Sequence, residues 1–279
     1  MPELPEVETM ARDLAPALVG RAVRDAYLVR PKLSPDPGLL AGIEGRQITA
    51  VRRRAKSIVI ELGDRALLLA PRMSGAPRID PFGTAPEKHD HFGFDLADGR
   101  RRHGAFRWRD PRMFGRLRLV YRTPDGYRDG EGRDPFARTG PEPLEIGAAA
   151  IAEQLAARPR AGIKALLLDQ RAVAGIGNIY ADEALYRAKI HPRTPAGLVP
   201  RPKLRALARA IVAVLEAGIA DRGARVRTYA PPSGGASMQL RLDAYGRSGL
   251  PCRRCRTTLA RGVIAGRTSV WCPRCQVDA

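Results

Sequence analysis

Four cysteines in the last thirty residues have the spacing of a metal site. They form two C-x₂-C pairs, Cys252 with Cys255 and Cys272 with Cys275, and sixteen residues separate the pairs. Two such knuckles supply four soft thiolates for a tetrahedral Zn²⁺ ion. Two disulfides are the alternative, which the lack of an export signal and of further cysteines disfavours. Because four protein ligands leave no position open for water, we expect one structural zinc ion without a catalytic role.

The chain begins with MPELPEVETMARDL, in which Pro2 precedes two carboxylates, Glu3 and Glu6, one helical turn apart. On these residues alone the simplest interpretation is the start of an amphipathic helix, since proline is tolerated where its missing N–H has no helical partner. Apolar residues follow at helical spacing: Val7, Ala11, Leu14 and Leu18. The helix would hold the two carboxylates beside the proline.

Two Gly/Pro-bounded segments place a long apolar side chain beside an arginine. PRMSG contains Met73, and DPRMFG contains Arg112 and Phe114. Apolar side chains inserted next to arginines are a means by which proteins open a base stack. The alternative is that Met73 and Phe114 cap a core, and the sequence leaves both interpretations open.

The composition is strongly basic, with 48 Lys and Arg residues against 29 Asp and Glu residues and a net charge of +19. Such an excess attracts polyanions, so nucleic acid is the leading partner and an anionic membrane surface the second. A length of 279 residues with 44% hydrophobic content allows about two domains with real cores. The first thirty residues lack the pattern of a signal peptide and no apolar run is long enough for a membrane span, so we expect a cytoplasmic protein.

The elements that must position these residues differ between the halves of the chain. Short β-branched runs between about residues 21 and 121 predict an antiparallel sandwich or barrel. GPEPLEIG at 140–147 is interpreted as a linker, and helical periodicity follows it. GIGN precedes one helix, with Asn178 expected as an N-cap whose following N–H groups suit a phosphate. Between the knuckles, two strands and a turn at Gly266 would present Arg267, either as a solvated residue or as a probe of phosphates. The Gly/Pro/Ser-rich stretch 227–239 is expected to be a linker or a flap.

Taken in order along the chain, these motifs resemble the bacterial formamidopyrimidine-DNA glycosylases, within the formamidopyrimidine-DNA glycosylase and endonuclease VIII family. The matching stretches run from the first residue to the last few: MPELPEVET, RRAK, MSG, EKHDH, DPRMFG, GPEPL, GIGNIYADEAL, AYGR and GRTSVWCPRCQ. A series of this length and order is far more specific than any one of its members.

The resemblance implies an α+β multidomain fold. Its parts would be an N-terminal catalytic β-sandwich with an N-terminal helix at 1–132, a linker at 133–146, a helix–two-turn–helix domain with a flexible lesion-capping loop at 147–238 and a Cys₄ zinc-finger β-hairpin at 239–279. It also implies a bifunctional DNA glycosylase and abasic-site lyase of base excision repair. Such an enzyme removes oxidised purines, 8-oxoguanine and formamidopyrimidines, from duplex DNA as a nucleoid-associated monomer with one structural zinc ion and no membrane partner.

The resemblance gives Pro2 a chemical role. If Met1 is removed, the secondary amine of Pro2 can attack C1′ of a damaged nucleotide, expel the base and form a Schiff base. The positive end of a helix should disfavour protonation of that amine. Glu3 and Glu6 would shuttle protons during ring opening and β,δ-elimination. Lys56 matches the family's lysine at the lesion and its phosphate.

The remaining site residues carry over from matching motifs. Met73, Arg112 and Phe114 match residues that fill the space left by a flipped nucleotide. Asn178 and Arg267 match phosphate-gripping residues, and we group Arg267 with the catalytic set. Two further predicted DNA-binding residues, His91 and Tyr245, lie in matching stretches. Lys164 and Glu183 complete the predicted DNA-binding set, because they resemble family residues near the active site.

Two departures from the family pattern concern DNA contacts. Ala70 and Pro71 stand where the family usually has His-Leu before the Met-Ser-Gly turn, and that histidine is implicated in holding DNA. Met238 stands where an aromatic residue is common in the flap region. Neither departure affects Pro2 or the cysteines.

Three other functions remain as alternatives. An endonuclease VIII-like enzyme would act on oxidised pyrimidines, but that group typically begins PEGPE where this chain has PELPE. A non-catalytic protein that binds damaged DNA would keep the basic charge and the zinc finger and need no free proline amine. A general zinc-ribbon DNA binder would leave the N-terminal motif without a purpose.

Overall fold

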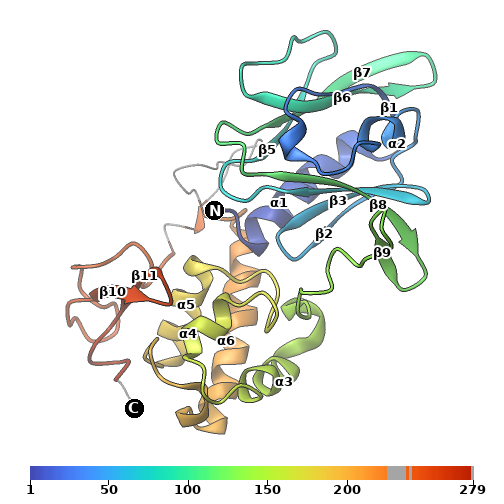
Figure 1. The fold of residues 1–279 in the computed structure, drawn as a ribbon. Coiled ribbons are helices and arrows are strands. Elements are labelled where there is room, and N and C mark those ends of the chain that lie inside the picture. Colours follow the sequence, from blue (N-terminus) through green and yellow to red (C-terminus); the bar gives the residue numbers. More distant parts are fainter. Residues whose placement is uncertain (225–236, 239–240, 278–279) are drawn as a thin grey trace. The chain divides into compact units, whose positions relative to one another are not determined.

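The computed structural model of the protein describes residues 1–224, 237–238 and 241–277. The chain divides into two compact units, here called unit 1, Met1–Ala137, and unit 2, Arg138–Ala224 with Ser237–Ala279 (Figure 1). Most of the expected flap at 227–239 lies outside the described residues. Every helix among the described residues is too short or too polar to cross a lipid bilayer.

Unit 1 begins with helix α1 (Leu4–Leu18), and the periodicity of its apolar residues is confirmed. Glu3 is the N-cap, and its backbone N–H donates to Glu6 Oε2 at 2.8 Å, which completes a capping box at the helix start. The buried face carries the predicted residues: Val7, Ala11, Leu14 and Leu18. The helix packs on strands β2 (Ala50–Arg54) and β3 (Ser57–Leu62) of one sheet and on β5 (Ala76–Asp80) of the other.

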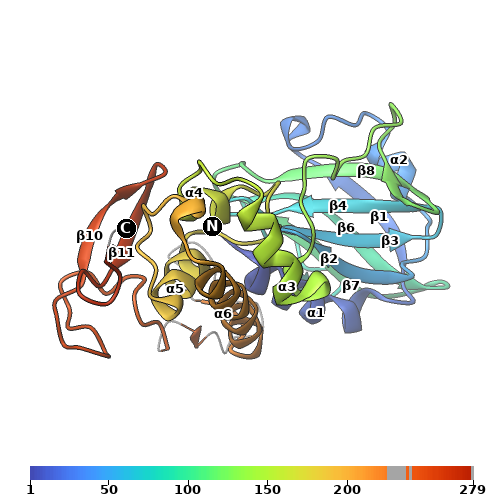
Figure 2. The same cartoon turned by 90° about the horizontal axis from the view of Figure 1, so that it is seen from below.

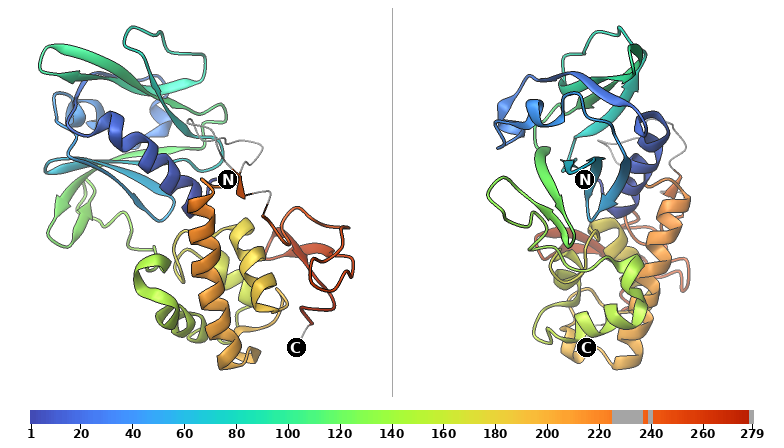
Figure 3. Two further views of the ribbon diagram at one scale, coloured as in Figure 1. Left: turned by 180° about the vertical axis from the view of Figure 1, so that it is seen from behind. Right: turned by 90° about the vertical axis from the view of Figure 1, so that its right-hand side faces the viewer.

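The predicted antiparallel sandwich is present in unit 1 (Figures 1 and 3). A four-stranded sheet has the order β1-β6-β7-β5, and a five-stranded sheet has the order β2-β3-β4-β8-β9. The strand bounds are β1 (Ala22–Leu28), β2 (Ala50–Arg54), β3 (Ser57–Leu62), β4 (Arg65–Ala70), β5 (Ala76–Asp80), β6 (Asp90–Asp98), β7 (Arg101–Arg109), β8 (Arg116–Thr123) and β9 (Gly126–Arg128). A short 3₁₀ helix, η1 (Pro31–Leu33), and helix α2 (Leu39–Ile43) follow β1.

Alternation along the strands decides which side chains form the core of unit 1. The inner positions of the five-stranded sheet belong to the main core cluster: Ile58, Ile60, Leu62, Leu67, Leu69, Leu117 and Leu119. The intervening positions point to the opposite face. There a smaller cluster of Val59, Ala66, Leu68 and Val120 is covered in part by Tyr127 and Phe136. The sheet therefore has an outer face with side-chain structure of its own.

Unit 2 is helical and carries one hairpin. Its elements are α3 (Pro143–Ala156), α4 (Ile163–Leu168), α5 (Asn178–Ala188), η2 (Ala196–Leu198), α6 (Arg201–Ala220), β10 (Ala260–Ile264) and β11 (Arg267–Trp271). Helix α6 packs on α3 and α5, and β11 lies beside α5 (Figure 2). The interpretation of 140–147 as a linker is only partly correct, because α3 already begins at Pro143. Gly147, at φ 74°, kinks the helix where the linker was expected to end.

Candidate functional site

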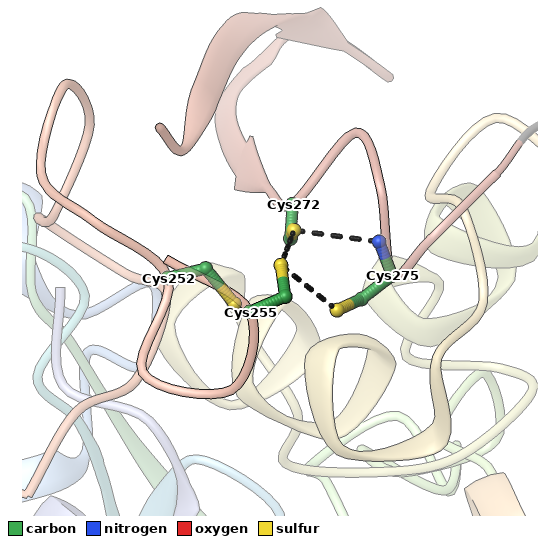
Figure 4. Close-up of side chains that lie close together, drawn as sticks. All are labelled: Cys252, Cys255, Cys272 and Cys275. Carbon is green, nitrogen blue, oxygen red and sulfur yellow. Dashed lines mark hydrogen bonds between the residues drawn. The ribbon is translucent and has the colours of Figure 1, made fainter. Parts of the chain in front are cut away.

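The four cysteines converge at one point of unit 2 (Figure 4). Their Sγ atoms all lie within 4.8 Å of one another, and Cys255 Sγ is 3.5 Å from Cys272 Sγ and 3.4 Å from Cys275 Sγ. Four sulfurs bound to one Zn²⁺ at about 2.3 Å are about 3.8 Å apart, so the arrangement fits a tetrahedral ion. The donor set is closed, and the metal would hold the knuckles together without reaching a substrate.

Neighbouring polar groups support this zinc centre. The hydroxyl of Tyr186, on α5, lies 3.2 Å from Cys252 Sγ, and the guanidinium of Arg254 stacks 4.0 Å from the centroid of the Tyr186 ring. The side-chain amide of Gln276 accepts from the N–H of Cys272 at 2.8 Å and donates to the carbonyl of Ile190 at 2.9 Å. These bonds tie the zinc-binding segment to the helical part of unit 2.

The N-terminal residues form a compact polar group in unit 1. Pro2 is buried directly before α1, and Met1 ahead of it is 41% exposed. Glu3 is 3% exposed and Glu6 is fully buried, with the Glu6 carboxylate accepting the Glu3 N–H. Removal of Met1 would convert the Pro2 nitrogen from a tertiary amide into a nucleophilic amine beside two carboxylates. The geometry thus places a potential nucleophile and potential proton carriers within one helical turn.

Lys56 lies in the tight turn between β2 and β3. Ala55, immediately before it, has φ 53°, so the chain reverses within two residues, and the partly exposed Lys56 directly precedes β3. A lysine held on a turn between paired strands has a well-defined backbone position. This suits the predicted role at a lesion phosphate, which stays a prediction.

Met73 and Phe114 are both exposed, at 36% and 45%, so neither side chain caps the core. The guanidinium of Arg112 lies 4.6 Å from the centroid of the Phe114 ring, which makes a cation–π pair at the tip of its loop. The neighbouring Met113 packs against the core instead. The structure therefore favours the interpretation of Met73 and Phe114 as side chains available for insertion.

Asp110, which the sequence analysis did not single out, holds these two loops together. It is fully buried; its Oδ1 accepts from Ser74 Oγ at 2.5 Å, and its Oδ2 accepts from the N–H of Gly115 at 2.7 Å. Gly115 is needed because a Cβ there would lie 2.8 Å from Asp110 Oδ2. One carboxylate thus fixes the loop of Met73 and the loop of Phe114. The only signal in the sequence was an acidic residue at the start of a Gly/Pro-bounded turn.

His91 lies on β6 and is only 5% exposed. Its ring makes an edge contact with the ring of His89, with 6.2 Å between centroids. Burial lowers the pKa of His91, and the charge of Arg30 lowers it further. The imidazole is therefore neutral at neutral pH and inside unit 1, and its predicted contact with DNA stays a prediction.

The expectation that Asn178 is an N-cap is wrong, because Gly177 is the N-cap and Asn178 is the first helical residue of α5. The Asn178 side chain instead donates from Nδ2 to the carbonyl of Thr268 at 2.8 Å. Arg267, the exposed first residue of β11, directly precedes Thr268 as the predicted hairpin required. The two predicted phosphate-binding residues are thus joined through the backbone of β11.

A cavity of about 350 Å³ lies beside this junction in unit 2. It is lined by Asn178, Tyr245, Gly246, Ser248, Arg261, Thr268 and Val270. The polar lining and the guanidinium of Arg261 suit an anion. Tyr245, predicted from its Y-G-R motif, therefore shares a cavity with Asn178.

Lys164 is fully buried and forms a polar network with neighbouring elements. Its Nζ lies 2.5 Å from Asp182 Oδ1 and 2.6 Å from Ser269 Oγ, and Asp182 Oδ2 accepts from the N–H of Val270 at 3.1 Å. Burial raises the pKa of Asp182 to about 6, although the ammonium of Lys164 opposes the shift. Lys164 thus joins α4, α5 and β11 from inside unit 2.

Glu183, also fully buried, organises the segment that carries Tyr245. Its carboxylate accepts three backbone N–H groups, from Asp243 at 2.9 Å, Ala244 at 2.9 Å and Tyr245 at 2.8 Å. Burial raises the pKa of Glu183, and these N–H groups lower it in part. For both Lys164 and Glu183 the structure shows protein partners, and their predicted contact with DNA stays a prediction.

The structure shows where two residues that depart from the family pattern, Ala70 and Met238, lie. Ala70 ends β4 and is partly buried. Met238 is fully buried, and its N–H donates to the carbonyl of Gly223 at 3.3 Å. Met238 is therefore packed inside the described part of the protein.

Comparison with known protein families covers most of the chain. Residues 1–117 match the formamidopyrimidine-DNA glycosylase N-terminal domain, residues 139–230 match the formamidopyrimidine-DNA glycosylase H2TH domain, and residues 249–277 match the zinc finger found in FPG and IleRS. The last match, with the four converging thiols, identifies the cysteine cluster as a zinc finger that holds one ion.

Relatives match over their whole length. The formamidopyrimidine-DNA glycosylase of Chloroflexus aurantiacus is 43% identical over 284 residues, covering 99% of this chain and 98% of the relative. That of Geobacillus kaustophilus is 37% identical, covering 99% of this chain and 100% of the relative. The crystal structure of the MutM (Fpg) protein from Thermus thermophilus has a TM-score of 0.85 at 37% identity and covers all of both chains. A mutant Lactococcus lactis FPG in complex with Fapy-dG-containing DNA has a TM-score of 0.87 at 32% identity, covering 99% of this chain and 100% of that one. From its N-terminal motif to its zinc finger, this chain belongs to the formamidopyrimidine-DNA glycosylase family.

Proposed function

We propose that the protein is a bifunctional DNA glycosylase and abasic-site lyase that removes oxidised purines from duplex DNA. The observation that carries the proposal is the position of Pro2, directly before α1 and within one turn of the buried carboxylates of Glu3 and Glu6. The similar Lactococcus lactis structures contain DNA with Fapy-dG or an abasic site, and a similar MutM structure contains an 8-oxoguanine analogue. These ligands support oxidised purines as the substrate class.

In this mechanism the Pro2 amine, freed of Met1, attacks C1′ of the damaged nucleotide. The C1′–N bond to the base breaks as the Pro2 nitrogen bonds to C1′ and releases its proton. The C1′–O4′ bond then breaks and O4′ takes up a proton, which opens the sugar and leaves a Schiff base (iminium) between Pro2 and C1′. Glu3 and Glu6 accept and return protons as the sugar opens and as β- and δ-elimination cleave the strand. Met73, Arg112 and Phe114 fill the vacated space in the duplex, and Lys56, Asn178 and Arg267 contact phosphates. The rest of the proposed DNA-binding set is His91, Lys164, Glu183 and Tyr245.

The domain organisation and the setting belong to the same proposal. We propose a catalytic domain at 1–132, a DNA-binding helical domain at 147–238 and a zinc-finger hairpin at 239–279. Residues 133–146 connect the first two domains, and the last four of them already belong to α3. The protein acts as a monomer on chromosomal DNA in the cytoplasm. The net charge of +19 supports a polyanionic partner.

Borohydride trapping tests the mechanism. Zinc-loaded protein is mixed with duplexes that carry 8-oxoguanine, an abasic site or an oxidised pyrimidine, and the Schiff base is reduced to a stable adduct. We expect an adduct on the first two duplexes that requires the free Pro2 amine. Pro2→Gly should trap far less, and protein that retains Met1 should trap none.

The outcomes separate the alternatives. Preferential trapping on the oxidised pyrimidine would point to an endonuclease VIII-like activity. Tight binding to damaged duplexes without an adduct on any of them, in protein shown by mass spectrometry to lack Met1, would refute catalysis and favour a non-catalytic damage-binding protein.

A further inference from the structure

A second cavity, of about 540 Å³, lies on the outer face of the five-stranded sheet of unit 1. We call it the basic pocket. Its floor comes from outer positions of β3, β4 and β8, namely Ser57, Leu68, Ala70, Arg116 and Arg118, and its rim from Lys32, Ser34, Pro35, Arg72, Pro135 and Phe136. The floor residues alternate along their strands with the inner core residues, so strand periodicity places them all on one face.

The charge of the basic pocket is strongly one-sided. Four cationic side chains line it, Lys32, Arg72, Arg116 and Arg118, and the described residues of its lining include no carboxylate. The contact of Arg118 with Asp129 is long, at 3.5 Å, and Asp129 is also engaged by Arg133 at 3.0 Å. Like charges gathered in one cavity repel each other, so an anion that enters is stabilised by all of them.

Two of these cations are available for a ligand. Across residues 1–224, 237–238 and 241–277, neither Lys32 nor Arg72 forms an ion pair, and both are exposed. Arg116 donates one hydrogen bond, from Nη1 to the carbonyl of Gly115 at 2.8 Å. Its other guanidinium N–H groups can therefore donate to an oxyanion. The hydroxyls of Ser34 and Ser57 add neutral donors.

The position of the pocket points to the source of that anion. Ser57 directly follows Lys56, Arg72 directly precedes Met73, and Arg116 lies two residues after Phe114. Three residues that we expect at the lesion therefore each lie within two positions of a residue of the pocket lining. The backbone of Arg72 has φ 54°, which turns the chain sharply at the end of β4. A DNA strand that contacts Lys56, Met73 and Phe114 would bring its backbone next to the pocket.

Ala70 leaves the space that the anion needs. It contributes only a methyl group to the floor, where any larger side chain would fill part of the cavity. The volume holds a phosphate group with several waters, each of which takes about 30 Å³ in the liquid. The small side chain of Ala70 leaves room for an anion, and the cations around it supply the opposite charge.

We infer that the basic pocket is a phosphate-binding subsite for the DNA strand next to the damaged nucleotide, with Arg72 and Arg116 as its main contacts. The inference rests on the proposed function for the presence of DNA at this surface. The shared chemistry is a phosphate oxyanion, which a DNA backbone or a free phosphorylated compound could supply. The proximity of the pocket lining to Lys56, Met73 and Phe114 in the chain favours the DNA backbone.

The test combines salt dependence with neutralisation of single phosphates. Affinity for a duplex with a stable abasic-site analogue is measured against KCl concentration for the full-length wild-type protein and for Arg72→Gln, Arg116→Gln and Arg72→Lys. Arg100→Gln, which removes an equally exposed arginine from the β6–β7 turn outside the pocket, is the matched control. Losing one phosphate contact should lower the slope of log affinity against log salt by about 0.9. At low salt, Arg72→Gln and Arg116→Gln should bind about ten- to a hundredfold more weakly, while Arg72→Lys keeps the slope.

A methylphosphonate scan locates the contact. Replacing one phosphate at a time along the damaged strand should weaken wild-type binding at one position next to the lesion, and Arg72→Gln should be insensitive at that same position. If Arg72→Gln and Arg116→Gln match Arg100→Gln in slope and in the scan, the inference is refuted. If inorganic phosphate binds the wild type and not Arg72→Gln while DNA affinity is unchanged, a free phosphate compound is the ligand and the DNA assignment is wrong.

The readouts are independent of the proposed catalysis. Absence of a borohydride adduct in wild-type protein that lacks Met1 would overturn the proposed function, because that reaction requires the Pro2 amine and not the pocket. Normal trapping by the wild type with an unchanged salt slope in both glutamine variants would instead overturn only the phosphate subsite.

Discussion

Replacing Lys164 with methionine should destabilise unit 2 by about 3–5 kcal/mol at pH 8, the usual cost of leaving one member of a buried ion pair without its partner. Lys164 is fully buried, and its Nζ lies 2.5 Å from Asp182 Oδ1. Methionine is unbranched like lysine and only one heavy atom shorter, so packing is largely kept and the main change is an unpaired carboxylate. Asp182 would then be charged in a site with little water.

The loss should depend on pH in a defined direction. In the wild type, burial raises the pKa of Asp182 to about 6 even with Lys164 beside it. Without the ammonium the pKa rises further, whereas an aspartate in the unfolded chain titrates near about 3.9. The folded variant therefore holds a proton that the unfolded chain has released, and its stability falls as pH rises through this window. The difference from wild type should grow by about 1.4 kcal/mol per pH unit between about pH 6 and the raised pKa of the variant.

Urea unfolding measures the effect, with the fluorescence of Trp271 on β11 as the probe in a Trp108→Phe background. Lys164→Met with Asp182→Asn should recover most of the stability and lose the pH dependence, since asparagine keeps an acceptor for the N–H of Val270. Lys203→Met, at an exposed position of α6, is the control and should change stability by less than about 0.5 kcal/mol. A Lys164→Met variant as stable as this control, or one with equal losses at pH 5 and pH 8, would refute the reasoning.

Three further predictions concern other parts of the described structure. Glu183→Ala should expose the amides of residues 243–245 to rapid hydrogen exchange, because each loses a charge-assisted bond worth about 1.5–3 kcal/mol; unchanged protection would contradict the capping role. The lowered pKa of His91 means that the folded state binds its proton more weakly than the unfolded chain, so stability should rise with pH up to about 6.5 and a His91→Asn variant should lose that rise; an NMR titration that places the pKa of His91 at or above about 6.5 would contradict this. Chelation of zinc should change the fluorescence of Trp271 in unit 2 and leave that of the buried Trp108 in unit 1, and an unchanged Trp271 signal would argue against a structural ion.

Several features were predictable from the sequence because they depend on short spacings. The periodicity of α1, the alternation of the strands and the two C-x₂-C knuckles each involve residues a few positions apart, whose relation is set by helix, strand or turn geometry. The hairpin that presents Arg267 also followed from local alternation and a glycine turn. One local expectation was wrong. Asn178 begins α5 and is not its cap, because Gly177 takes that position and the asparagine side chain binds Thr268 on a distant strand.

The interactions that assemble the candidate site join residues far apart in the chain. Asp110 clamps Ser74 to Gly115, Glu183 caps residues 243–245, and Lys164 reaches Ser269. No periodicity links such partners, and an isolated Asp, Glu or Lys in a sequence is usually a solvated residue. Burial is what converts them into structural groups, since a buried charge needs a partner.

By itself, the sequence determined the chemistry that is available to this protein: a proline that can become an amine, two carboxylates beside it, four thiolates for zinc and an excess of arginine for a polyanion. The tertiary structure alone decided that Met73 and Phe114 are exposed on loops clamped by Asp110, and that four cations from three separate stretches of chain line one basic pocket beside Ala70. The physical reason is that residue type sets what a side chain can do, whereas its exposure, charge state and neighbours depend on which strands and helices pack together. How the strands and helices pack depends on the sequence of the whole chain and not on any one segment.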